Sequence, residues 1–128
     1  MKALLLDGHV FLWWLSDAAE LGPQTREAIA DPSSEVYVSS ATIWELEIKA
    51  AAGKLRVPSG MLEALYEGGF LELEVSARHA RRAAWLEWDH RDPFDRMLVA
   101  QAQIEGLSLV TADTSVRQFD SGCLDARS

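Results

Sequence analysis

Short apolar runs alternate along the chain with longer segments of helical periodicity. The runs at residues 2–6, 36–38 and 107–110 consist mainly of aliphatic, aromatic or β-branched residues, and their length is typical of strands buried on both faces of a parallel sheet. Residues 70–75 instead alternate apolar and acidic side chains, which predicts an edge strand or an extended connection with one exposed face. The pattern therefore predicts several strands, one of them at an edge.

The segments between these runs carry helical spacing together with helix start and stop signals. Asp92 and Pro93 open the last of these segments, while Gly53 and Gly106 end two of them. Strands that alternate with helices predict an α/β fold: a three-layer α/β/α domain comprising residues 1–128, with right-handed crossovers and a central parallel sheet of about four or five strands. The end of the chain is weakly specified. The expected helices span residues 9–15, 24–30, 40–52, 59–67, 78–88 and 93–105.

The length and composition favour a single soluble domain. A chain of 128 residues can bury about two thirds of its unfolded surface. No apolar run approaches the roughly 20 residues needed to cross a bilayer, and Asp7 and His9 interrupt the N-terminal run, which lacks the apolar centre of a signal peptide. The single cysteine, Cys123, cannot form an internal disulfide. We therefore expect a cytoplasmic protein that does not bind membranes.

The net charge of −8 argues against a protein that holds nucleic acid through a broad basic face. Acidic side chains that gather at a metal site contribute to this excess, and bound cations would reverse the local sign of charge. The charge therefore weighs against nucleic-acid binding without excluding a metal-dependent nuclease.

Four carboxylates far apart in the sequence are expected at one edge of the sheet. Asp7 and Asp113 each follow a predicted strand, and ligands of open α/β sheets bind outside the carboxyl ends of the strands. Glu45 lies inside the predicted helix at residues 40–52 and Asp95 near the start of another, so both can face these strand ends. Neighbouring carboxylates repel one another unless a cation joins them, and oxygen ligands without a His or Cys cluster favour Mg²⁺ or Mn²⁺ over Zn²⁺. The sequence therefore predicts a metal-dependent site for phosphoryl transfer.

Each of these acids also has a purely structural explanation. Asp7 can cap the helix that follows it, Asp95 can stabilise a helix N-terminus through the helix dipole, and Asp113 can be a turn residue. Glu45 can pair with Lys49 four residues later, a contact worth a few tenths of a kcal/mol. Their common place in the topology favours the shared site, because four coincidences would otherwise be needed.

Four segments of the chain, in order, resemble those of the PIN domain family, and within it the VapC-type toxins of bacterial and archaeal toxin–antitoxin pairs. Each segment contains one of the four acids, and the likeness covers most of the sequence. The chain departs from the family at Gly8, where relatives usually carry Thr or Ser next to the first acid. The segments are LLLDGHVFLWWL at residues 4–15, SSATIWELEIK at residues 39–49 with GKL at residues 53–55, DPFDRMLVAQA at residues 92–102, and LVTAD at residues 109–113.

The resemblance implies an endoribonuclease that cuts single-stranded or structured RNA with Mg²⁺ or Mn²⁺. Such proteins are usually homodimers that a cognate VapB-type antitoxin inhibits, and they contact DNA only indirectly, through the antitoxin. Asp7, Glu45, Asp95 and Asp113 match the acidic positions of the family one for one. A catalytically weak PIN-like module that binds RNA or an antitoxin is the alternative, because the hydroxyl missing at Gly8 would alter hydrogen bonding near the metal.

The roles expected of these residues follow the usual chemistry of metal-activated water. Asp7, Asp95 and Asp113 would hold the metal directly or through water, while Glu45 would position or deprotonate the attacking water. A competing route would use the 2′-hydroxyl of the RNA and a pair of histidines, but no such pair emerges from the sequence. The candidate substrate contacts are Arg96, Lys49 and His9, with a packing or surface role as the alternative for His9.

The five tryptophans exceed what a core of this size ordinarily needs. Trp13 and Trp14 are adjacent, so on a helix they cannot both face the same way. Either one of them faces a partner or both are buried between packed helices.

Overall fold

The computed structural model describes residues 2–128 as a parallel five-stranded sheet with helices on both faces. The strand order is β3-β2-β1-β4-β5, and every neighbouring pair is parallel, which confirms the predicted α/β class and sheet. β3 lies at one edge, as the alternation at residues 70–75 predicted. The strands are β1 (Ala3–Leu6), β2 (Glu35–Ser39), β3 (Leu71–Leu73), β4 (Ser108–Thr111) and β5 (Leu124–Asp125).

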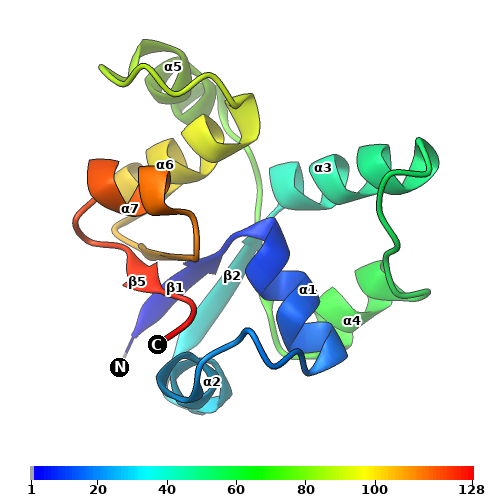
Figure 1. Cartoon of the computed structure of the whole chain (residues 1–128). Helices are drawn as coiled ribbons and strands as arrows, with labels where there is room; N and C mark the ends of the chain where they lie inside the picture. The colour runs from blue at the N-terminus through cyan, green and yellow to red at the C-terminus, as the bar shows by residue number, and fades with distance from the viewer. Residues whose placement is uncertain (1) are drawn as a thin grey trace.

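The helices divide between the two faces of the sheet. Helices α1 to α4 contribute buried residues to one hydrophobic cluster, and α6 and α7 contribute to the other. Figure 1 shows α5, α6 and α7 on one side of the sheet and α1 and α4 on the other. The helices are α1 (Gly8–Ser16), α2 (Pro23–Ala30), α3 (Ser40–Ala51), α4 (Met61–Glu67), α5 (Ala77–Trp85), α6 (Pro93–Glu105) and α7 (Thr114–Phe119).

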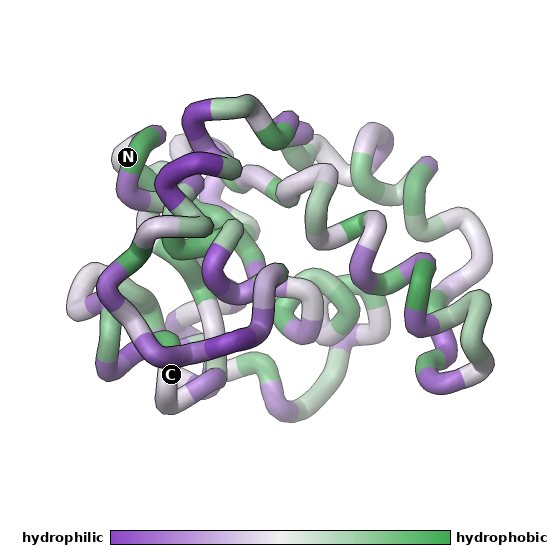
Figure 2. The backbone as a smooth tube through the Cα atoms, turned by 90° about the horizontal axis from the view of Figure 1, so that it is seen from above, coloured by the Kyte–Doolittle hydropathy of each residue, from purple (hydrophilic) through white to green (hydrophobic). Residues whose placement is uncertain are grey.

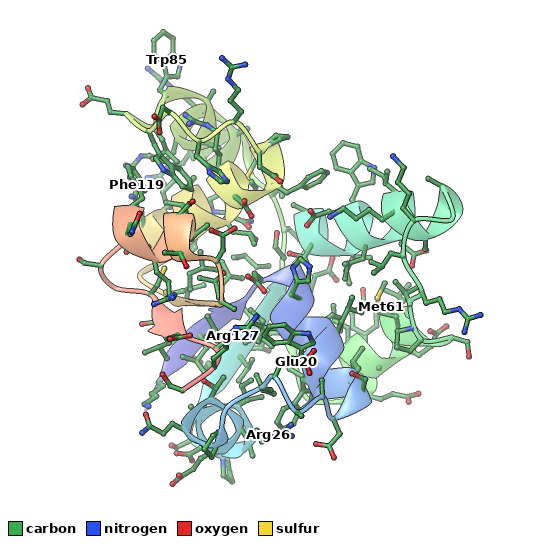
Figure 3. The ribbon with its side chains drawn as sticks, viewed as in Figure 1. Glu20, Arg26, Met61, Trp85, Phe119 and Arg127 are labelled. Carbon is green, nitrogen blue, oxygen red and sulfur yellow. The ribbon has the colours of Figure 1, made fainter. Side chains whose placement is uncertain are left out.

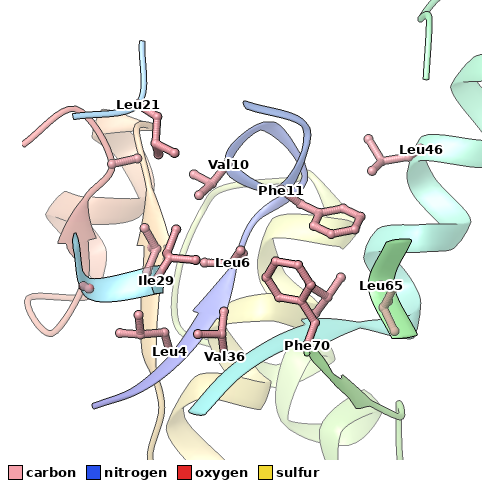
Figure 4. Packing of buried hydrophobic residues seen from close by; sticks show 14 of the residues in the cluster. Leu4, Leu6, Val10, Phe11, Leu21, Ile29, Val36, Leu46, Leu65 and Phe70 are labelled. Carbon is pink, nitrogen blue, oxygen red and sulfur yellow. The ribbon is translucent and has the colours of Figure 1, made fainter. Parts of the chain in front are cut away.

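The central strand β1 sends alternate side chains into the two clusters. Leu4 and Leu6 join the cluster that contains Phe11 and Phe70, whose rings meet edge to face at 5.5 Å, while Leu5 joins the opposite cluster. Figure 4 shows the first of these clusters around Leu6. Purple and green segments alternate along much of the helical backbone in Figure 2, as expected for helices with one buried face. Burial on both faces explains why β1 reads as an uninterrupted apolar run.

The end of the chain, which its sequence specifies weakly, forms α7 and β5 through contacts with distant residues. The backbone N–H of Ala126 donates to Thr111 at 3.0 Å, and that of Gly22 donates to Ala126 at 2.9 Å. A Cβ at Gly22 would lie only 2.0 Å from the carbonyl oxygen of Ser128, so this approach requires glycine. These contacts fix the terminus against β4 and the start of α2.

Helix α5 ends at Trp85, three residues before the predicted end at Trp88. Leu86 leaves the helical conformation, with φ of −58° and ψ of 131°, and the segment that follows is held by Arg96 on α6. The Arg96 side chain therefore donates hydrogen bonds to carbonyls at the end of α5 and just beyond it. This tertiary interaction cannot be seen in the helical pattern of the sequence. The guanidinium donates to the carbonyls of Ala83, Leu86, Trp88 and His90 at 3.0, 2.9, 2.6 and 3.0 Å, and to that of Ala84 at 3.5 Å.

No helix among residues 2–128 is long and apolar enough to span a membrane.

We predict that Arg96→Ala lowers the free energy of unfolding by about 2–4 kcal/mol, because it removes the donor from several partly buried carbonyls at once. Urea denaturation followed by circular dichroism measures this loss. Arg91→Ala, at the neighbouring exposed arginine, is the control and should change stability by less than about 0.5 kcal/mol. Equal losses in the two variants would contradict the structural role of Arg96.

Candidate active site

A cleft of about 310 Å³ lies beside the carboxyl ends of β1 and β4. The four acids from distant segments, Asp7, Glu45, Asp95 and Asp113, all line it, and Asp92 adds a fifth carboxylate. Asp7 and Asp113 immediately precede α1 and α7, after β1 and β4, whereas Glu45 lies inside α3, which follows β2, and Asp95 lies in the first turn of α6. The remaining lining residues are Gly8, His9, Trp13, Lys49, Leu98, Ala112 and Arg127.

Asp7 is fixed between β1 and α1. Its backbone N–H donates to Val110 of β4 at 3.1 Å, and its Oδ1 accepts from the N–H of Val10 at 2.9 Å, which caps α1. Burial raises the pKa of the Asp7 carboxyl above its usual value, and the negative charge of Glu45 acts in the same direction. Hydrogen bonds, chiefly from the Thr111 hydroxyl, oppose that shift. The cleft thus holds a carboxylate whose charge the protein compensates only in part.

Glu45 lies on α3 with 14% of its side chain exposed. Its Oε2 accepts from the Lys49 ammonium at 3.1 Å, which is the i,i+4 pair that the sequence allowed. A Cβ built at Gly8 would lie 3.6 Å from Oε1 of Glu45 and 3.3 Å from the Leu46 side chain, which is tighter than ordinary contact. Gly8 therefore lets α1 approach α3 closely, and a Thr or Ser side chain there would require Leu46 to shift.

Asp95 lies in the first turn of α6 and is held by His90. The imidazole Nε2 lies 2.7 Å from Asp95 Oδ2, where its N–H can donate to the carboxylate. His90 stacks on Trp88 at 4.4 Å, and Trp88 stacks on Phe119 at 4.5 Å, so the imidazole is confined in one orientation. Burial raises the pKa of Asp95, the His90 hydrogen bond opposes this shift, and the charges of nearby acids reinforce it.

Asp113 and Asp92 are exposed residues that cap helices with one oxygen each. Asp113 Oδ1 accepts from the N–H groups of Ser115 and Val116 at 2.8 and 3.2 Å. Asp92 Oδ1 accepts from Phe94 and Asp95 at 2.8 and 3.2 Å. From the sequence, Asp92 was expected only to open a helix. Its spacing of three positions from Asp95, about one helical turn, was nevertheless a signal that the two acids lie on the same side of the helix.

The basic and aromatic residues of the cleft only partly match those singled out from the sequence. Lys49 and His9 line it, whereas the Arg96 guanidinium is bound to the carbonyls of residues 83–90. Arg127, which Figure 3 labels, lines the cleft instead. Its guanidinium lies over the Trp13 ring, 5.3 Å from the ring centroid. No sequence signal pointed to Arg127, because only the docking of the chain end brings it here.

The donors in the cleft fit a hard divalent cation in their chemistry. Most of the possible ligands are carboxylate oxygens, and burial, with a smaller contribution from neighbouring acids, raises the pKa of Asp7 and of Asp95, so a bound cation would stabilise their charged forms. Within residues 2–128, however, no three Asp, Glu, His or Cys side chains are close enough to form a metal-binding group as they stand. One ion bound by three of these acids would require their side chains to draw together.

Comparison with solved structures shows the same fold in toxin–antitoxin systems. A chain of a toxin–antitoxin complex from Klebsiella pneumoniae superposes with a TM-score of 0.68 at 18% identity, covering 96% of this chain and 97% of that one. A chain of VapBC2 from Rickettsia felis, bound to a DNA fragment from its promoter, gives a TM-score of 0.68 at 12% identity, with 96% of each chain covered. At these identities the likeness concerns the fold alone.

Comparison of sequences gives the family directly. No curated protein matches the chain significantly. The family model of the PIN domain matches residues 4–122, which include all four acids of the cleft, and the chain therefore belongs to the PIN domain family.

Proposed function

We propose that this protein is a metal-dependent endoribonuclease, the toxin of a VapBC-type toxin–antitoxin pair, that hydrolyses RNA phosphodiester bonds with Mg²⁺ or Mn²⁺. PIN domains are generally nucleases, and they generally use divalent metal ions. The observation that carries the proposal is the convergence of Asp7, Glu45, Asp95 and Asp113 on one cleft at the sheet edge. A cluster of hard oxygen donors beside basic side chains suits a substrate with phosphate groups.

In this proposal Asp7, Asp95 and Asp113 hold the ion, directly or through water. The bound ion supplies a more acidic water and stabilises negative charge on the phosphate. Asp7 and Asp113 each cap a helix through Oδ1 and Asp95 accepts from His90 through Oδ2, and none of these three contacts uses the second carboxylate oxygen. Glu45, whose Oε2 is paired with Lys49, positions or deprotonates the attacking water through Oε1. The products then carry 5′-phosphate and 3′-hydroxyl ends.

Lys49 and His9 are the proposed substrate contacts among the residues that line the cleft, and Arg127 joins them. Each can place a positive charge or a donor near the phosphate backbone. Arg96, proposed from the sequence to contact substrate, acts instead through the segment that carries His90. The proposed substrate is RNA.

The proposed partners are a VapB-type antitoxin and a second copy of this chain, in the cytoplasm. Support comes from the similar structures, which are toxin–antitoxin complexes, one of them bound to promoter DNA. Contact of this chain with DNA would then be indirect, through the antitoxin. Trp44, which is 64% exposed, and Trp85, which is 81% exposed, are the tryptophans most open to partners, whereas Trp13 and Trp14 are partly buried.

Asp7→Asn and Asp95→Asn are each expected to reduce Mg²⁺-dependent RNA cleavage by about 100-fold or more, because each removes a charged ligand from the ion that stabilises the transition state. Cleavage is measured on a panel of labelled RNAs with and without EDTA. Glu27→Gln, at an exposed acid on α2, is the matched control and should cleave like wild type. Undiminished cleavage by both Asn variants would refute the assignment, and absence of metal-dependent cleavage by the wild type would favour a binding module.

The raised pKa of Asp7 predicts how its charge affects stability without metal. The pKa of Asp7 is higher in the folded than in the unfolded protein, so the protonated carboxyl favours folding. This contribution to the free energy of unfolding is fully present below the unfolded pKa and is lost as the pH rises through the folded pKa. Asp7→Asn, which keeps an oxygen to cap α1, should therefore raise the Tm in EDTA near pH 7 and raise it less as the pH falls toward about 4. Thermal unfolding across this range checks the sign.

Addition of Mg²⁺ or Mn²⁺ should make the Tm of wild type higher than that of Asp7→Asn, the reverse of their order in EDTA. Wild type is expected to gain about 2.7 kcal/mol of stability at a metal concentration 100 times the Kd, while Asp7→Asn gains less because the ion has one ligand fewer. An unchanged wild-type Tm across a millimolar titration would count against the site.

His90→Ala is expected to weaken Mn²⁺ binding by about 10- to 100-fold, because the Asp95 carboxylate loses the donor that orients it. The midpoint of the Mn²⁺-dependent rise in Tm measures this affinity independently of cleavage. His90→Gln, which retains a side-chain donor, is the conservative variant and should restore part of the affinity. Identical midpoints for wild type and His90→Ala would rule out the positioning role.

A further inference from the structure

Helix α5 presents three arginines and a tryptophan on one exposed face. Arg78, Arg81, Arg82 and Trp85 stand at positions i, i+3, i+4 and i+7, so their side chains project from the same side of the helix. All four are exposed, and the Trp85 side chain, with 81% of its surface accessible, points away from the sheet in Figure 3. With residues of the following segment and of α6, they line a hollow of about 550 Å³.

The charge of this face is opposite to that of the whole chain. Residues 77–85 contain three arginines and no acid, although the protein carries a net charge of −8. Within residues 2–128 none of these guanidiniums forms an ion pair, and Arg82 donates to the Gln103 amide at 3.0 Å. The one acid that lines the hollow is Glu87. The face therefore has positive charge that the described residues leave mostly unneutralised.

The opposite face of α5 is built into the fold, so the arginines are held on a fixed support. His79 and Ala83 are buried there, and the His79 imidazole joins α5 to Glu105 of α6 at 2.8 Å while also closing a capping box with Ser76. At the other end, Arg96 binds the carbonyls of the last turn. A helix secured at both ends presents its exposed groups with little ordering cost on binding.

We propose that this arginine and tryptophan face of α5 is a binding surface for single-stranded RNA, outside the acidic cleft. The arginines contact successive phosphates, and the exposed indole of Trp85 stacks on a base, which is the usual combination in single-strand binding. Trp85 stacks on no other aromatic ring among the described residues, so its faces are open to a base. The naming of RNA as the ligand rests on the proposed nuclease function.

The position of α5 connects the surface to the cleft. Residues 86–92 lead from Trp85 to the start of α6, where His90 holds Asp95, and Figure 1 shows α5 packed beside α6. RNA bound along α5 would be retained by a helix with three arginines and no acid, and would reach the carboxylates by extending past Trp85 along residues 86–92. This explains how a chain of net charge −8 can hold a polyanion without a basic face over the cleft.

The test measures binding without cleavage, using the whole chain in EDTA. The probe is a short fluorescein-labelled single-stranded oligoadenylate, followed by fluorescence anisotropy over a range of KCl concentrations. Arg78→Gln combined with Arg81→Gln should weaken binding by about tenfold or more and reduce the slope of log K against log[salt] by about 1.4, because each neutralised phosphate accounts for about 0.7 of the slope. Arg82 is left intact because it bonds to Gln103. The charge-matched control is Lys2→Gln with Arg56→Gln, both exposed and distant from α5 in the sequence.

Trp85 is tested separately. Trp85→Ala should weaken binding about tenfold with little change in the salt slope, because stacking carries no net charge, while Trp85→Phe should retain most of the affinity. Oligoadenylate should also quench the indole fluorescence of wild type more than that of Trp85→Phe.

Two results would overturn the inference. One is equal affinity and salt slope for wild type, the double arginine variant and its control. The other is tighter binding of poly-glutamate than of oligoadenylate at equal charge, which would assign the face to an acidic protein segment. The proposed nuclease function fails in a different way: wild type would then bind RNA with the predicted dependence on α5 and yet show no metal-dependent cleavage.

Discussion

The parallel pairing of β1 with β4 brings the first and the last acid of the cleft together. Leu6 is in register with Val110, and the N–H of Asp7 donates to the Val110 carbonyl at 3.1 Å, so the chain leaves both strands at the same edge. Asp7 and Asp113 are separated by most of the sequence and meet only because of this register. A slip of one residue would turn the side chains of β1 to the opposite face, exchanging Leu5 with Leu4 and Leu6 between the two clusters. The packing of both cores thereby fixes the position of the acids.

The acids of the cleft form the helix caps and the ion pair expected of purely structural residues, and they also lie together in one cleft. Asp7, Asp92 and Asp113 each cap a helix through Oδ1, and Glu45 pairs with Lys49, as a purely structural interpretation requires. The caps hold Asp7, Asp92 and Asp113 at helix starts and the Lys49 pair holds Glu45 within α3, and each of these contacts uses one carboxylate oxygen. The caps therefore orient the groups that a cation would need, and the same carboxylate can serve as a helix cap and as a metal ligand.

Local pattern was sufficient for most of the fold, and tertiary contact decided the rest. The strands β1, β2 and β4, the edge strand β3 and the positions of the first six helices follow from apolar periodicity, glycine stops and Pro93. The end of α5 was misplaced because Arg96 captures the carbonyls beyond Trp85. Arg127 was missed because its place in the cleft depends on hydrogen bonds between the chain end and residues about 100 positions earlier, donated by the backbone of Gly22 and by the backbone and hydroxyl of Thr25. Such long-range contacts leave no periodic trace in the sequence.

In the proposed function, the distribution of charge separates RNA binding, on the arginines of α5, from cation binding, by the carboxylates of the cleft. Lys49 already pairs with Glu45 in the cleft, and more basic side chains paired with the cleft acids would occupy oxygens that a cation requires. An acidic cleft alone would repel a polyanion before any ion neutralised it. With three arginines on α5, no arginine forms an ion pair with a carboxylate of the cleft among the described residues, and the segment between α5 and α6 is held by the hydrogen bonds of Arg96. Arg96 donates both to the carbonyl of Ala83 on α5 and to that of His90, and His90 contacts Asp95, so one side chain links the basic helix to the residue that orients a cleft acid.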